Sequence, residues 1–579
     1  MSDDHEDEGS GAAGEALEAV EHALEAATGL AGETEAGEVL HAAAEAASTL
    51  NAARGAVEGV VGVARSLQRG EAGGALSNAA RGASGAMDAS RHVLDNAEAR
   101  RAMQEASSAA RTGQQLYDQG RSVAEGMASG GSANDDVEYH LEVESFEARW
   151  GVQHMDAHEA LNEPFQLTVH ALVTDAHPEA RDLLGKDCSL RVERRSQQRT
   201  LKGFVQHARV RPSIEHGTRV ELRIAPRLWL LGRNQDTRIY QDKTVPEIVQ
   251  ELYQRLLSST GRQVRTELTA TYPRHEYLTQ YQESDLAFMT RLCEQEGVFF
   301  YFDHEANDHE TLVLADHASG LALVRDDGRV PFAEDPHQAP EDEAVFDAEH
   351  EDSIGATDAV HGEYDWTHPQ VAVRGERTGL GEGEPAIQVY DHTEAVALHD
   401  YDAGSRGYRA NDAAARARRR TEELRLRRER WSLQSTVVSA QPGRVIELTG
   451  CPDGSLDGRD LIVSSSARGQ ATEGRSGAYS NALHCVPVDV PFRPPKLHRR
   501  PVVAGPETAI VVGPAGEEIH TDDHGRIKVQ FHWDRQGQRN ERSSCWLRVS
   551  QMWGGDADLD LARSGASRST AIDCAEPLF

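Results

Sequence analysis

The stretch ESDLAFMTRLCEQEGVFFYF, residues 283–302, predicts a helix that runs directly into a strand. Ser284 stands at the N-cap position, and Gly297 supplies a left-handed stop. The residues after the glycine, 298–302, are strong β-formers. Apolar side chains recur at steps of three and four and so share one helical face, at Leu286, Met289, Leu292 and Cys293. Because Cys293 lies on this apolar stripe, we expect a buried thiol there rather than a nucleophile.

Length and charge limit the classes of protein to which the chain can belong. With 579 residues it is too long for one ordinary core, so we expect two to four domains. Its formal net charge of -35 argues against nucleic acid as a partner, because phosphates would be repelled. Its 6 cysteines show no CxxC or paired spacing, which is typical of a reducing cytosol. We see neither a signal peptide nor an apolar run of membrane-spanning length, so export would need another route.

Changes in composition divide the chain into four regions, which together predict a mainly β fold with some α. Residues 1–135 are rich in Ala, Gly and Glu and predict a helical extension. Its Ala faces bury little area, so this extension is either partly disordered or completed by self-association or a partner. Residues 136–500 alternate in short segments and predict two barrel-like domains with inserted helices. Residues 501–555 predict a small OB-type barrel, and 556–579 form an atypical tail.

Two further helices are expected inside the region of barrel-like domains. Residues 245–257 carry Pro246 in the first turn and an apolar stripe. A second helix, at about 412–430, is crowded with arginines, at positions Arg416, Arg418, Arg419, Arg420, Arg425, Arg427, Arg428 and Arg430. A nucleic-acid site is one interpretation, but we expect a solvated face that pairs with the chain's own carboxylates. The polar, glycine-rich residues 325–385 predict no definite element.

The segment IKVQFHWD, residues 527–534, predicts a half-buried strand of the OB-type barrel. Ile527, Val529, Phe531 and Trp533 are expected on one face, with Lys528, Gln530 and His532 on the other. A turn with Gly525 at a positive-φ position precedes it, and CWLRVSQMW, residues 545–553, predicts the next strand. We expect five positions to define this fold: Gly525, Val529, Phe531, Trp533 and Trp546.

A search for catalytic motifs finds no residue on which an enzyme could rely. The sequence contains no HExxH, GxSxG or P-loop, and the glycines of TGLGEGEP lack the setting of a dinucleotide site. His392 and His399, beside Asp391 and Asp400, could in principle gather a metal ion. In a chain with 26 histidines, coincidence is the better interpretation. We therefore predict no catalytic, cofactor-binding or metal-binding residues, no cofactor and no enzymatic activity.

Three long blocks resemble the VgrG family, the spike or tip proteins of bacterial type VI secretion systems. They are residues 233–249 (RNQDTRIYQDKTVPEIV), residues 281–302 with LVLAD shortly after, and residues 521–537 (TDDHGRIKVQFHWDRQG) followed by 543–555. The resemblance covers about residues 137–555, and the blocks appear in the family's order. It implies that the opening helix-strand unit is a structural piece of the hub wall, with Leu286, Phe288, Met289 and Leu292 in the core.

The resemblance also implies an assembly and its partners. The family forms a homotrimer similar to the hub and spike of contractile phage tails, and this trimer sits on the Hcp tube. An OB domain follows, and then a β-helical needle that is usually tipped by a PAAR protein. The spike is cytoplasmic before firing and is then driven out by sheath contraction with effector proteins bound or fused to it. No signal peptide is needed for that route.

The chain departs from the family pattern at both ends. After WGG, residues 553–555, the family continues with further OB strands and the needle, whereas DADLDLARSGASRSTAIDCAEPLF shows neither. We therefore expect an incomplete OB barrel and no needle, which puts a PAAR partner in doubt and makes a truncated or frameshifted product a hypothesis. The extension 1–135 lies outside the family pattern, and we expect it to dock an effector, chaperone or neighbouring spike component.

Three alternatives stay open beside a type VI spike. The chain could be the hub of a related contractile phage-tail-like particle, or a VgrG remnant that no longer pierces. It could also be an effector enzyme whose activity resides in residues 1–135, which the low aromatic content of that region disfavours.

Overall fold

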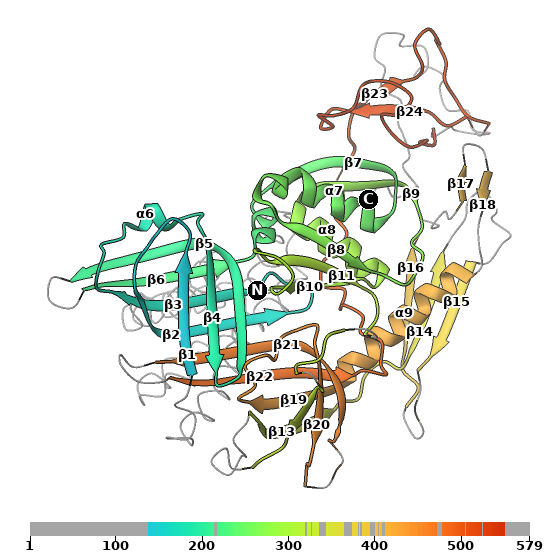
Figure 1. Cartoon of the computed structure of the whole chain (residues 1–579). Coiled ribbons are helices and arrows are strands. Elements are labelled where there is room, and N and C mark those ends of the chain that lie inside the picture. The colour runs from blue at the N-terminus through green and yellow to red at the C-terminus, as the bar shows by residue number, and fades with distance from the viewer. Residues whose placement is uncertain are drawn as a thin grey trace, which may run out of the picture. The chain divides into compact units, whose positions relative to one another are not determined.

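The computed structural model describes residues 137–549 apart from short gaps. The gaps fall at residues 214–216, 319–320, 326, 335–342, 364–372, 380, 382–384, 394–399, 403–404, 408–410, 453, 455, 472–476, 504 and 524. The expected helical extension and the atypical tail therefore lie outside the described residues. In the part that is described, the fold is mainly β, as predicted (Figure 1). None of the helices there has the length and apolar character needed to cross a bilayer.

Six antiparallel strands form one half of a 12-stranded sheet, in the order β1-β4-β5-β6-β3-β2 (Figure 1). Their bounds are β1 Val137–Val143, β2 Trp150–Ala160, β3 Gln166–Val173, β4 Asp187–Arg194, β5 Gln197–Ser213 and β6 Gly217–Ala225, with the short helix α6 Ala180–Leu183 between β3 and β4. Alternate residues of each strand point into one core, as in β3, where Leu167, Val169 and Ala171 are buried. A bridge between Val137 and Gly477 links β1 to the other half of the sheet.

The other half of this sheet comes from strands far along the chain. β2 pairs with β21, and the order continues β21-β22-β19-β13, while β20 pairs with both β21 and β12. The bounds are β12 Arg329–Pro331, β13 Val345–Asp352, β19 Glu429–Ser435, β20 Val445–Thr449, β21 Gly458–Gln470 and β22 Ala478–Pro487. β21 and β22 are not among the predicted strands, because the run SSSARGQ lacks the β-branched alternation on which the prediction depends. Their hydrogen bonds to neighbouring strands stabilise them instead, as where β21 pairs with β2 and Gln470 lies opposite His154.

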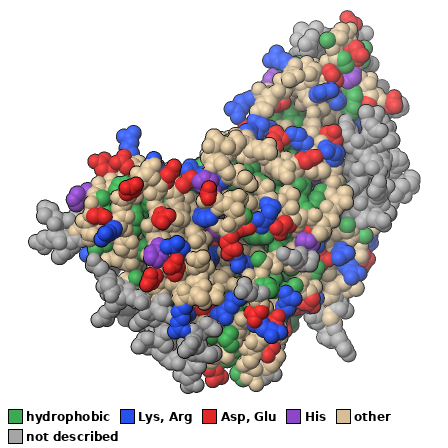
Figure 2. Space-filling model, in the orientation of Figure 1, with side chains coloured by type: hydrophobic (Ala, Val, Ile, Leu, Met, Phe, Trp, Pro, Cys, Tyr) green, Lys and Arg blue, Asp and Glu red, His purple; other side chains and the backbone are tan. Residues whose placement is uncertain are grey.

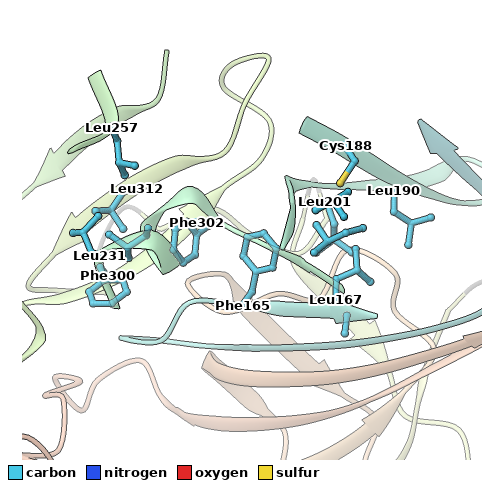
Figure 3. Packing of buried hydrophobic residues seen from close by; sticks show 14 of the residues in the cluster. Phe165, Leu167, Cys188, Leu190, Leu201, Leu231, Leu257, Phe300, Phe302 and Leu312 are labelled. Carbon is cyan, nitrogen blue, oxygen red and sulfur yellow. The ribbon is translucent and has the colours of Figure 1, made fainter. Parts of the chain in front are cut away.

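The segment between the two halves of the sheet contributes helices and two small sheets. Its elements are η1 Arg227–Gly232, β7 Gln235–Lys243, α7 Val245–Leu257, η2 Ser258–Thr260, β8 Gln263–Glu267, β9 His275–Ser284, α8 Asp285–Glu296, β10 Phe299–Asp303 and β11 Thr311–Ala315. The hydrophobic core continues from the first strands into this segment. Phe165, just before β3, meets Phe302 of β10 edge-on with ring centroids 5.4 Å apart (Figure 3).

Helix α8 confirms the local predictions made from the opening stretch. The Ser284 hydroxyl accepts a hydrogen bond from the Ala287 amide at 3.1 Å, and Gly297 has φ 72°. Of the predicted stripe, Met289, Leu292 and Cys293 are buried and Leu286 is half-buried. Phe288, which the resemblance placed in the core, is buried as well. The prediction of a single apolar face was incomplete, because much of the opposite face is also enclosed by other segments of the chain.

The polar region 325–385 contains strands that the sequence did not predict. β14 Asp358–Glu363 lies between β15 Val373–Thr378 and β16 Gln388–Thr393, and two short strands follow, β17 Asp400–Asp402 and β18 Ser405–Gly407. The arginine-rich helix α9, Asn411–Arg428, packs on this sheet. At Gly375 an added Cβ would lie 2.1 Å from the backbone carbonyl of Ala413, so only glycine permits this approach.

The last described module is a two-stranded sheet of β23 Ala509–Val512 and β24 Lys528–Phe531. Gly525 has φ 70°, as predicted for its turn. The predicted alternation was wrong at Gln530, which is buried between Val529 and Phe531 because its amide donates to the Asp534 backbone oxygen at 3.1 Å. The predicted strand at 545–553 is present, within the described residues, as a single bridge from Leu547 to Ile527. The OB barrel itself stays a prediction.

Candidate functional site

Helix α8 carries four charged side chains that are buried. The exposed fractions are 0% for Asp285, 1% for Arg291, 5% for Glu294 and 6% for Glu296. Taking a charge out of water is costly unless it is paired and hydrogen-bonded. The partners of these four residues therefore show which segments α8 holds together.

Asp285, in the first turn, joins α8 to the preceding segments. Its carboxylate accepts hydrogen bonds from the Arg255 guanidinium of α7 at 3.1 Å and from the Gln280 amide of β9 at 2.8 Å. The Asn234 amide, just before β7, also donates to it. Its position at the helix N-terminus favours the negative charge further, because the helix dipole is positive there. One carboxylate thus fixes three separate segments.

Arg291 occupies the middle of the helix and is among the largest fully buried side chains of the described residues. Its guanidinium donates to Glu283 at 2.6 Å and to the Thr279 carbonyl of β9 at 3.3 Å. It also lies over the Phe288 ring, 5.3 Å from the centroid. These contacts satisfy the buried charge and attach the helix to β9.

Glu294 holds a segment that we call the strap, residues 493–498 (RPPKLH). One carboxylate oxygen accepts from the backbone amides of Leu497 and His498, at 3.1 and 3.0 Å. The other lies 2.7 Å from His498 Nδ1. Charge-assisted hydrogen bonds of this kind are about twice as strong as neutral ones. A residue of α8 therefore anchors a segment about 200 positions away in the sequence.

The other end of the strap is held by Arg493. Its guanidinium donates to the carbonyl oxygens of Gly297 at 3.1 Å and Asp316 at 2.9 Å, and to the Glu422 carboxylate of α9 at 2.7 Å. Between the two ends, the Lys496 amide donates to Glu423 of α9 at 3.3 Å. The strap is thereby tied to both α8 and α9.

Glu296 closes the network at the end of α8. Its carboxylate lies 3.5 Å from His275 and 3.6 Å from Arg419 of α9. Burial by itself would raise the pKa of Glu296, but the nearby His275 ring and the Arg419 charge outweigh it and lower the pKa to about 2. The group therefore stays ionised throughout the physiological range. Burial raises the pKa of the neighbouring Cys293 thiol to about 12, so this buried cysteine is a poor nucleophile, as expected.

The arginines of α9 pair with carboxylates, which confirms that part of the prediction. The pairs are Arg416 with Glu363, Arg418 with Glu422, Arg419 with Glu296, Arg420 with Asp391 and Glu423, Arg425 with Glu429, and Arg427 with Glu423. Basic and acidic side chains are likewise interspersed over the face in Figure 2. The helix is less solvated than predicted, because it packs on the sheet of β14, and Arg428 is buried.

The last module contacts the two-stranded sheet of β7 and β9 through one carboxylate and one aromatic pair. Glu507 accepts from the Tyr281 hydroxyl at 2.6 Å and from the Trp533 indole at 2.7 Å. The two rings meet edge-on at 5.9 Å, and Arg535 pairs with Asp236 at 2.5 Å. Trp533, predicted to define an OB fold, thus serves a contact between modules that the sequence alone did not indicate. Trp546, predicted likewise, lies beside His520 with ring centroids 4.9 Å apart.

The weak metal candidate is only partly within the described residues. Asp391 pairs with Arg420 at 3.4 Å, and His392 lies beside the Tyr390 ring. His399 and the Asp400 side chain fall outside the described residues, so this pairing stays untested. Sequence reasoning did not find the cluster of Glu138, His140 and Glu193, which strand pairing brings together on the surface. In this cluster His140 lies 3.5 Å from Glu138 and 3.6 Å from Glu193, as in an ordinary ion pair at the protein surface.

Comparison with known proteins identifies the class to which this architecture belongs. The family described as phage tail baseplate hub (GPD) matches residues 158–472, which is more than half of the 579-residue chain. The chain therefore belongs to the phage tail baseplate hub family. The predicted resemblance to VgrG proteins is also confirmed by curated relatives.

Two of these relatives are type VI secretion system spike proteins of Pseudomonas aeruginosa. VgrG1a is 32% identical over 413 residues, which cover 70% of this chain and 62% of the relative. VgrG1b is 31% identical over 411 residues, which cover 70% of this chain and 54% of the relative. The chain thus spans less than two thirds of the length of either protein. A solved E. coli protein, c3393, described as a component of the type VI secretion system, has 22% sequence identity and a TM-score of 0.49, covering 68% of this chain and 88% of that chain.

Proposed function

We propose that the chain is the structural spike and hub subunit of a type VI secretion apparatus. In this proposal three copies form a hub on an Hcp-like tube and help to deliver effector proteins during contraction, without chemistry of their own. The observation that carries the proposal is the α8 network, in which buried ion pairs hold segments of the hub region together. A part that transmits force works through rigidity, and a buried polar network with satisfied partners stiffens the segments that it joins.

The proposal extends to cellular location and to the division of the chain. The protein would be cytoplasmic before firing and would leave through the apparatus itself. Residues 136–500 would form the hub and 501–555 the base of the spike. The extension 1–135 is the candidate region for an effector or adaptor protein.

Oligomeric state and tube binding test the proposal directly. We expect the purified full chain to elute as a trimer by light scattering and to co-elute with the purified Hcp-like tube protein. Deleting the gene should abolish release of the tube protein into the medium, and the full chain should restore it. A monomer at micromolar concentration that ignores the tube protein would contradict the proposal.

A second candidate is the hub of a related contractile phage-tail-like particle, which the name of the matching family favours. The two candidates differ in what the chain co-purifies with. A phage-type particle should yield tail and sheath proteins from intact particles, whereas a type VI hub should yield the Hcp-like tube protein and depend on neighbouring secretion genes.

A further inference from the structure

Strands β5 and β6 place four arginines on one solvent-facing sheet surface. In the register of this pair, Arg209 lies opposite Glu221 and Arg211 lies directly opposite Arg219. Arg223 lies two residues beyond Glu221 along β6, opposite His207. The intervening residues Val220, Leu222 and Ile224 of β6 are buried in the core. Because directly opposed residues share a face and side chains alternate along a strand, the charged residues all point away from the core.

These arginines are exposed and short of carboxylates. The exposed side-chain fractions are 48% for Arg209 and 42% for Arg223, and Arg211 and Arg219 are also exposed. Glu221 is shared by Arg209 at 3.2 Å and Arg223 at 3.5 Å. Among the described residues, which exclude the turn at 214–216, no ion pair joins a carboxylate to Arg211 or Arg219.

The neighbouring strands add no compensating negative charge. On β3, His170 lies opposite Glu221, and on β2, His154 lies opposite His170, with ring centroids 5.9 Å apart. Asp156 of β2 is already engaged, because it pairs with His154 at 2.6 Å and with Arg468 at 3.0 Å. The surface is therefore basic in a chain whose formal net charge is -35.

Two like charges directly opposite each other destabilise a strand pair. The repulsion between Arg211 and Arg219 therefore lowers the stability of this strand pair. A carboxylate bound between the two guanidinium groups would offset that repulsion. Guanidinium groups bind carboxylates through two parallel hydrogen bonds, which gives geometric as well as electrostatic selectivity. We propose that this face, the arginine face of Arg209, Arg211, Arg219 and Arg223, binds an acidic segment of a partner protein.

The spacing of the arginine face defines the kind of segment that fits it. Alternate residues of a strand are roughly 7 Å apart, and neighbouring strands are about 5 Å apart. Arg209 and Arg211 therefore match carboxylates on alternate residues of an extended segment, as in a Glu-x-Glu sequence. A nucleic acid is disfavoured, because its continuous phosphate charge would extend beyond this small face onto an acidic chain.

Binding of a labelled acidic peptide tests the proposal on the full chain. The probe is a fluorescein-labelled peptide with Glu at alternate positions, followed by fluorescence anisotropy at low salt. The double variant R211S/R219S should weaken binding by about tenfold, because it removes two guanidinium contacts. R211K/R219K should weaken it less, because it keeps the charge and loses only the fork.

A matched control separates the proposed site from a general loss of charge. Arg329 and Arg459 are also exposed strand arginines that share one carboxylate, Glu447. R329S/R459S should therefore bind the peptide like the wild-type chain. Equal weakening by the two double variants, or no binding by the wild-type chain, would overturn the proposal. So would a single-stranded oligonucleotide that binds as tightly as the peptide and loses affinity in R211S/R219S.

Discussion

Replacing Glu294 by alanine should release the strap while leaving the rest of the hub folded. The substitution removes the acceptor of three hydrogen bonds, from the Leu497 and His498 amides and the His498 ring. Each charge-assisted bond contributes more than a neutral one, but alanine also removes the cost of burying the carboxylate, so we take roughly 1 kcal/mol net for each bond and a loss of about 3 kcal/mol for the strap. The effect is local, because the strap is outside the hydrophobic core. The opening equilibrium of the strap should rise by about two orders of magnitude.

Limited trypsin digestion under native conditions measures this opening. Lys496 lies within the strap, whereas the bond after Arg493 resists trypsin because Pro494 follows it. We expect the fragment that begins at Leu497 to appear about 100 times faster in E294A than in the wild-type chain, as followed by mass spectrometry. E294Q, which keeps one amide oxygen as an acceptor, should be intermediate.

A matched control and a clear contrary outcome accompany this experiment. Glu349 is an exposed glutamate of β13, so E349A should leave the cleavage rate after Lys496 unchanged. If E294A is cleaved there no faster than E349A, the carboxylate does not hold the strap. If E294A instead unfolds globally in a thermal melt, the assumption that the strap opens on its own is wrong.

Three further substitutions test packing and charge burial. Burial and the nearby Asp489 raise the pKa of Asp460 to about 6. Its ionised carboxylate therefore lowers the stability of the fold above pH 6, and this cost disappears below about pH 4. In paired thermal melts, D460N should stabilise the chain by up to about 3 kcal/mol at pH 8 and have little effect at pH 4. Burial lowers the pKa of His304 to about 3. The neutral ring therefore contributes stability above about pH 6.5, and this stability is lost as the pH falls toward 3. In H304N, the free energy of unfolding should fall less steeply over this range, by about 1.4 kcal/mol per pH unit. G375A should cost about 2 kcal/mol, because its Cβ meets the backbone of α9, whereas the control G458A, with nothing within 4 Å, should be close to neutral in the same melt.

Local signals in the sequence were sufficient for elements whose stability is decided within a few residues. The helix at Val245–Leu257 was predicted with its bounds, and the structure adds the capping box formed by Thr244 and Glu247. Gly297 and Gly525 were predicted to have positive φ and do. These features depend on backbone sterics and neighbouring hydrogen bonds, which a short stretch of sequence contains in full.

Long-range contacts could not be predicted, because their partners are far apart in the chain. Nothing in the local sequence distinguishes Glu294, and only its contact with His498 shows that it anchors the strap. The strands β21 and β22 were not predicted from the sequence, and they complete the sheet by pairing with β2 and β19. Arg211 and Arg219 are ordinary surface residues in sequence, and the register of β5 and β6 makes them opposed charges.

The sequence by itself determined where the chain turns, where its clearest helices start and stop, and, through three long blocks, the family of hubs it resembles. The tertiary structure alone decided which charges are buried and which segments they join. The physical reason is that caps and turns are settled by interactions over three or four residues. The cost of burying a carboxylate, by contrast, is settled by whichever distant donors the fold brings to it.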